Sequence, residues 1–233
     1  HVREADENKI TAYHEAGHAV IQALLKDADP LHKVTIIPRG QSLGATFSLP
    51  EKDRTGFAQR WLTATMRVLC GGRLAEQRAV GDVSSGASQD IAQVTQLARL
   101  MVEEWGMSER LGFVRYAGED RRDAFVAEKT HSDETAKIID EEVRRLVDEA
   151  YRDAERLLDE EWTKVEAVAE ALLKFETLSG EEVHKVMRGE SIGRSSLADI
   201  LASQRRTPPS APTTTPEEDE GPDAAPGLMP SPA

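Results

Sequence analysis

Apolar positions along the chain follow two periods, and each period predicts one kind of element. Apolar residues recur at steps of three and four over residues 6–25, from about residue 55, over 91–105 and over 132–173, as they do on the buried faces of α-helices. Residues 31–37 are rich in β-branched side chains and end at a Pro-Arg-Gly turn, and residues 43–49 form a second extended stretch. The pattern therefore predicts a mainly α fold with a small β-element, either a hairpin or part of a small sheet.

Residues that favour caps and breaks refine this outline. The glycine pair at residues 71–72 predicts an interruption of the second helix, and residues 113–116 predict a short strand. Ser132 is the expected N-cap of the long helical stretch, which we expect to break near Asp159. Ser-Gly-Glu-Glu predicts a capping box that opens a last short helix, over residues 179–187.

The C-terminal segment has a different composition. Residues 207–233 are rich in Pro, Ser, Thr and acidic side chains, which cannot bury enough apolar surface to offset the entropy of ordering. We therefore predict a folded domain over residues 1–192 and a disordered tail over residues 193–233.

Charge and composition exclude some classes of protein. A net charge of −13 argues against binding of nucleic acid, which needs clustered Lys and Arg. No apolar run approaches the roughly 20 residues that span a bilayer. Because the chain begins with His1 and not Met, we expect a fragment or a processed product, with any membrane anchor outside it. The single cysteine, Cys70, rules out an internal disulfide.

The strongest chemical pattern is His-Glu-x-x-His at residues 14–18. Residues four apart lie on the same face of a helix, so His14 and His18 can bind one ion. Zinc brings the pKa of bound water down to about 7, and Glu15 is placed to take its proton during attack on a carbonyl. An exposed helix face with no metal is the alternative, but apolar residues at helical spacing put the histidines on or beside the buried face, where imidazoles need partners.

A catalytic zinc ion usually has three protein ligands, so one more is needed. Asp90 begins a helix after a loop of small polar residues, and Glu76 lies on a helix that we expect to pack nearby. Spacing alone does not choose between them. The weaker candidates are Asp82, His32, His131 and His184.

Several segments resemble the peptidase domain of the FtsH family, the membrane-bound ATP-dependent zinc proteases. They are Ile-Thr-Ala-Tyr-His-Glu-Ala-Gly-His-Ala, His-Lys-Val-Thr-Ile-Ile-Pro-Arg-Gly, Gly-Gly-Arg-Leu-Ala-Glu, Ser-Gly-Ala-Ser-Gln-Asp, Trp-Gly-Met-Ser and His-Ser-Asp-Glu-Thr-Ala, in this order within residues 8–188. The resemblance implies that His14, His18 and Asp90 are the zinc ligands and that Glu15 is the general base of a zincin-like site. Glu76 then becomes a supporting residue.

The resemblance also implies partners. FtsH proteins carry an upstream ATPase module and transmembrane helices, and they assemble as hexamers that degrade unfolded or membrane proteins. This chain has no Gly-x-x-x-x-Gly-Lys-Ser/Thr pattern, so we expect ATP to act only through a module outside it. We expect the domain to lie at the cytoplasmic face of a membrane. The alternative function is a zinc-stabilised assembly module without catalysis.

Overall fold

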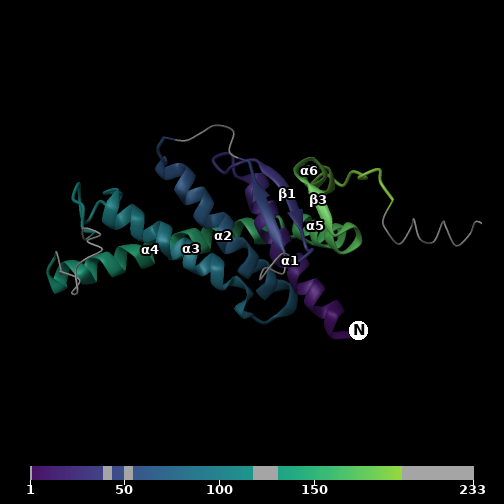
Figure 1. Ribbon diagram of the computed structural model, residues 1–233, viewed down its shortest axis with the longest axis horizontal. Helices are drawn as coiled ribbons and strands as arrows, with labels where there is room; N and C mark the ends of the chain where they lie inside the picture. The colour runs from purple at the N-terminus through teal and green to yellow at the C-terminus, as the bar shows by residue number, and fades with distance from the viewer. Residues whose placement is uncertain (1, 39–43, 50–54, 118–130, 196–233) are drawn as a thin grey trace, which may run out of the picture.

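The computed structural model describes residues 2–38, 44–49, 55–117 and 131–195, and the helices dominate it (Figure 1). The elements in chain order are α1 (Val2–Leu24), β1 (Leu31–Thr35), β2 (Ala45–Ser48), α2 (Gln59–Val80), the 3₁₀ turn η1 (Ser85–Ala87), α3 (Ser88–Arg99), the π-helical η2 (Leu100–Glu104), α4 (Asp133–Glu160), α5 (Trp162–Phe175), β3 (Thr177–Ser179) and α6 (Gly180–Met187). The prediction of a mainly α fold with a small β-element is confirmed. The predicted tail lies outside the described residues from residue 196 onward.

Helix α1 is the centre of the packing. From Thr11 to Gln22 nearly every side chain is buried or half-buried, because α1 packs against α2 on one side and α5 on another. A helix with buried residues around its circumference is typical of a core element. The residues of the His-Glu-x-x-His pattern are therefore held on a helix that has little freedom to move.

A three-stranded antiparallel sheet lies beside α1, with the order β2-β1-β3. The predicted hairpin partner of β1 is confirmed, with Thr35 opposite Ala45. The third strand, β3, was not predicted from the sequence. It pairs Thr35 with Thr177 and leaves β2 at the edge. In Figure 1 the sheet lies with α5 and α6 towards one end of the molecule, and α4 extends towards the other.

The glycine pair does not interrupt α2, which is continuous from Gln59 to Val80. Glycine within a helix costs about 1 kcal/mol relative to alanine, so packing must offset the cost. The reason is a helix crossing, because a Cβ on Gly71 would lie 2.8 Å from the carbonyl oxygen of Gly17, and one on Gly17 would collide with the Gly71 carbonyl. Close contact between α1 and α2 requires glycine on both helices.

The predicted strand at residues 113–116 is also wrong, since this segment has no strand pairing. Phe113 is fully exposed, and the backbone N–H of Tyr116 donates to the Glu103 carbonyl at 2.8 Å instead of to a strand. The cap predictions are confirmed. The Ser132 hydroxyl accepts from the Thr135 N–H, and Ser179 forms the full capping box of α6.

Candidate metal centre

Three side chains from two helices converge on one point. His14 and His18 come from α1, and Asp90 comes from the first turn of α3. The two Nε2 atoms are 3.1 Å apart, and the Asp90 Oδ2 atom lies 3.3 Å from His14 Nε2 and 3.5 Å from His18 Nε2. A tetrahedral zinc ion with ligand bonds of 2.0–2.1 Å separates its ligands by about 3.3 Å. The three distances therefore match three corners of such a tetrahedron.

Each imidazole is oriented by a partner at its other nitrogen. His18 Nδ1 lies 2.7 Å from the Val68 carbonyl oxygen on α2, and His14 Nδ1 lies 3.4 Å from Glu76 Oε2. A carbonyl and a carboxylate can only accept, so each Nδ1 carries a proton and each Nε2 is the ring atom left to bind a metal ion. This is the tautomer that a metal-binding histidine needs.

The electrostatics of the cluster favour a positive charge at its centre. Burial opposes protonation of His18, but the Asp90 carboxylate, Glu15 and the Val68 carbonyl favour it and raise the pKa of His18 to about 9. Burial would raise the pKa of Asp90, but hydrogen bonds from His14 and His18 hold that pKa well below its usual range. The cluster thus attracts a cation, and a metal ion can take the place of a proton.

Gly72 leaves the space that an ion needs. A Cβ at this position on α2 would lie 2.7 Å from His14 Nε2 and would collide with His18 Nε2. It would therefore lie beside the two Nε2 atoms that face Asp90. The donor set of two imidazoles and one carboxylate, together with this cradle, fits zinc.

Glu15 lies beside the cluster and is only 6% exposed. Its Oε2 atom accepts a hydrogen bond of 2.7 Å from the Thr46 hydroxyl on β2. Sequence reasoning missed both Thr46 and Gly72 as parts of the site. A threonine in a strand carries no chemical signal, and the glycine pair indicated only a break or a close contact.

The other sequence candidates for the third ligand are placed elsewhere. Among the described residues, the only group of histidine and carboxylate side chains close enough to share an ion is His14, His18 and Asp90. His32 and His184 are exposed, and His131 packs edge-on against Tyr116. Asp82 accepts from the N–H of Val83. Glu76 is buried next to His14 on the side away from Asp90, which fits its predicted supporting position.

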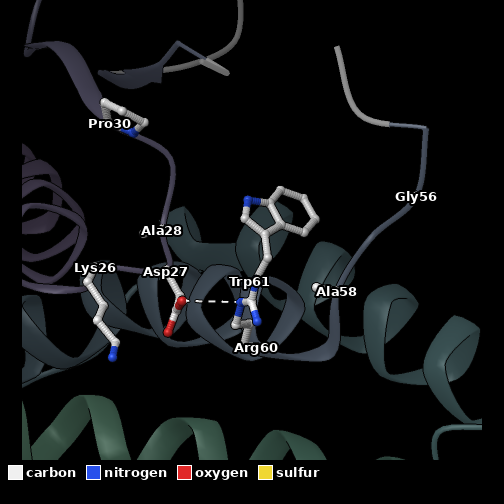
Figure 2. Close-up of a pocket in the computed structure, with 8 residues that line it drawn as sticks. All are labelled: Lys26, Asp27, Ala28, Pro30, Gly56, Ala58, Arg60 and Trp61. Atoms are coloured by element: carbon white, nitrogen blue, oxygen red, sulfur yellow. Dashed lines mark ion pairs between the residues drawn. The ribbon is translucent and has the colours of Figure 1, made fainter. Parts of the chain in front are cut away.

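The surface hollow in Figure 2 is separate from this cluster. It has a volume of about 370 Å³ and lies between the end of α1 and the beginning of α2, where Arg60 pairs with Asp27 at 3.5 Å. Its lining consists of Lys26, Asp27, Ala28, Pro30, Gly56, Ala58, Arg60 and Trp61. None of the three converging residues lines it, so the hollow is no part of the candidate centre.

Within the described residues, no helix combines the length and the hydropathy that crossing a membrane requires.

Comparison with known proteins finds relatives that cover most of this chain. The chain is 47% identical over 188 residues to the ATP-dependent zinc metalloprotease FtsH 2 of Methylacidiphilum infernorum, which covers 78% of this chain and 29% of that protein. It is 42% identical over 213 residues to the ATP-dependent zinc metalloprotease YME1 homolog of Caenorhabditis elegans, covering 90% of this chain and 30% of that protein. It is 48% identical over 191 residues to an FtsH of Protochlamydia amoebophila, covering 79% of this chain and 21% of that protein.

The chain thus spans less than a third of the length of these curated relatives. A model of peptidase family M41 matches residues 1–186, which include the whole candidate centre and all the described helices and strands except Met187, the last residue of α6. The chain belongs to peptidase family M41.

Proposed function

We propose that this chain is a zinc-dependent endopeptidase domain that cleaves unfolded polypeptides. His14, His18 and Asp90 hold the ion, and Glu15 is the general base. The observation that carries the proposal is the convergence of two Nε2 atoms and one carboxylate oxygen at distances of 3.1–3.5 Å, with the acidic side chain of Glu15 beside them. The names of the relatives, which are zinc metalloproteases, support the choice of metal.

The ion supplies Lewis acidity, which brings the pKa of water near 7 and polarises the scissile carbonyl. Glu15 accepts the proton of the attacking water and passes it to the nitrogen of the leaving amine. The Val68 carbonyl and Glu76 hold the two imidazole rings in orientation. Burial of Glu15 limits the access of bulk water to its carboxylate.

Strand β2 is the proposed site for the substrate backbone. In the described part of the chain β2 pairs only with β1, so its other edge carries backbone groups that can pair with an extended peptide. Because main-chain hydrogen bonds do the holding, cleavage should tolerate many sequences. N-methylation of single amides along a model peptide should weaken cleavage, and equal cleavage of all methylated peptides would contradict strand addition.

We propose that residues 1–192 form the peptidase domain, and the family match over residues 1–186 supports this boundary. The relatives are named as ATP-dependent, so we propose that an ATPase module of the longer protein delivers substrate to this domain. Assembly as a hexamer at a membrane stays a prediction.

The deciding experiment compares the wild-type chain with Glu15→Gln, using a short unfolded peptide that needs no unfolding by an ATPase. Both proteins should bind about one zinc ion per chain, and the variant should lose roughly 10²–10⁴-fold in kcat. Equal cleavage by both would remove Glu15 from catalysis. Zinc binding without any cleavage by the wild type would favour the assembly module instead.

A further inference from the structure

The beginning of β2 contacts the general base in two ways. The Thr46 hydroxyl donates to Glu15 Oε2 at 2.7 Å. A Cβ on Gly44 would lie 2.7 Å from Glu15 Oε1 and 2.8 Å from Glu15 Cγ. The backbone just before β2 therefore lies directly against one carboxylate oxygen, and the Thr46 side chain on β2 binds the other.

The backbone at Gly44 lies close to β1 as well as to Glu15. The Cβ position of Gly44 is also only 2.9 Å from the carbonyl oxygen of Thr35, on the neighbouring strand. Since β2 pairs with β1 from Ala45 to Ser48, its place is fixed by the sheet and not by Glu15. The sheet thus forms a rigid wall for a carboxylate that comes from a different element, α1.

We propose that Thr46 is a positioning residue, which holds the carboxylate of Glu15 in the orientation that proton transfer needs. The inference rests on the proposed role of Glu15 as general base. A carboxylate can rotate about its terminal torsion with little cost, so an oriented hydrogen bond to one oxygen selects one rotamer. The other oxygen, Oε1, then lies against the backbone at Gly44.

The arrangement has a geometric consequence for the substrate. If the substrate pairs with the outer edge of β2, the strand that sets its register also sets the position of the base. A peptide bond and the carboxylate that acts on it would then be aligned by a single element. Such alignment should raise the rate of cleavage greatly, since a displacement of about 1 Å can lower a reaction rate a hundredfold.

The test uses Thr46→Val, which keeps the shape and removes the hydroxyl, and Thr46→Ser, which keeps the hydroxyl. Thr46→Val should lower kcat by roughly tenfold to a hundredfold with little change in KM and with zinc content unchanged. Thr46→Ser should restore most of the loss. The matched control is Thr177→Val on β3, where the lost hydroxyl contacts Thr35 at 2.7 Å on the opposite edge of the sheet.

A second measurement does not depend on cleavage. In the metal-free protein, a double-mutant cycle of Thr46→Val and Glu15→Ala should show that the first substitution destabilises the wild type more than it destabilises the alanine variant. Additive effects in the cycle, or a kcat for Thr46→Val equal to that of the Thr177→Val control, would overturn the inference. Failure of the wild type to cleave would contradict the proposed function alone, because the cycle would still report the contact.

Discussion

Two regions of the molecule bury carboxylates, and they neutralise them in opposite ways. In the arginine cluster, which comprises Ser108, Arg110, Glu142 and Arg145, the Glu142 side chain is 1% exposed. Arg145 forms hydrogen bonds of 3.0 and 2.9 Å to its two oxygens, and the Ser108 hydroxyl adds a third at 2.7 Å. This carboxylate is satisfied from within the chain.

The metal centre brings together three acidic side chains, those of Glu15, Glu76 and Asp90, with two imidazoles. Among the described residues, no Lys or Arg forms an ion pair with any of the three. Isolated charges are costly to bury, so a cluster with this excess of carboxylates needs a cation. The arginine cluster therefore neutralises its buried carboxylate with the chain's own side chains, whereas the candidate metal centre needs a bound ion to neutralise its carboxylates.

The largest expected difference between the two regions is in metal binding. Asp90→Ala should abolish zinc binding and peptide cleavage, because it removes one of three ligands. Glu142→Ala should keep both, although the protein should be less stable. Zinc content by atomic absorption and cleavage of a short peptide provide the measurement. Full zinc content and activity in Asp90→Ala, with loss of both in Glu76→Ala, would show that Glu76 is the third ligand.

The space for the ion can be tested at Gly72. Gly72→Ala should lower zinc affinity by roughly a hundredfold or more, since ligand distances must stay within about 0.2 Å of ideal values. Gly86→Ala is the control, because a Cβ there meets only the Ser84 hydroxyl, at 3.1 Å. Competition with a chromophoric chelator measures both affinities. Unchanged affinity in Gly72→Ala would place the ion elsewhere.

Glu76 should have an intermediate effect. Its carboxylate lies 3.4 Å from His14 Nδ1, and loss of such a partner typically costs 10–100-fold in metal affinity. Glu76→Gln should therefore weaken zinc binding by about this factor and keep one ion per chain at saturation. A variant that binds as tightly as the wild type would reduce Glu76 to a packing residue.

The smallest effect concerns stability in acid. Hydrogen bonds from Arg145 lower the pKa of Glu142, burial opposes them, and Ser108 and Arg110 assist. Because the folded pKa is below the unfolded value of about 4.3, the stabilisation is present above pH 4.3 and is lost as the pH falls through the folded pKa.

Glu142→Gln should therefore cost about 1–3 kcal/mol at pH 7 and progressively less in acid. Urea unfolding with a chelator present, from pH 7 down to pH 3, keeps the metal centre out of the measurement. A cost that is independent of pH would show that the charge of Glu142 contributes nothing.

The helices could be predicted from the sequence because their signals are local. Apolar periodicity and the caps at Ser132 and Ser179 depend only on neighbours within a few residues. Strand β3 could not be predicted, since three residues carry no period and the strand exists only because β1 lies beside it. Residues 113–116 show the reverse case: their side chains favour a β-strand, but no strand in the described part of the chain lies beside them to pair with.

The candidate metal centre was also predictable only where its residues are close in sequence. His14, Glu15 and His18 lie within one helical turn and a half, so their common face follows from the helix alone. The choice between Asp90 and Glu76 depends on how three helices cross, and Gly17 and Gly71 set only the crossing of α1 and α2. Resemblance to the FtsH family pointed to Asp90, which spacing alone could not, and the structure brings Asp90 together with the two histidines. The contact of Thr46 with Glu15 joins residues that are 31 positions apart on different elements, so no local pattern in the sequence could predict it.

The pairing of β1 with β3 also determines when this protein can fold. The hydroxyls of Thr35 and Thr177 meet across 142 residues of sequence. A ribosome releases the chain from its N-terminus, so α1 and the β1–β2 hairpin emerge long before β3 exists to cover the open side of β1. Contacts this distant in sequence form slowly and close late. The proposed cleavage site should therefore mature only when synthesis has passed α6, so that on the proposed function a growing chain should be unable to cleave its neighbours.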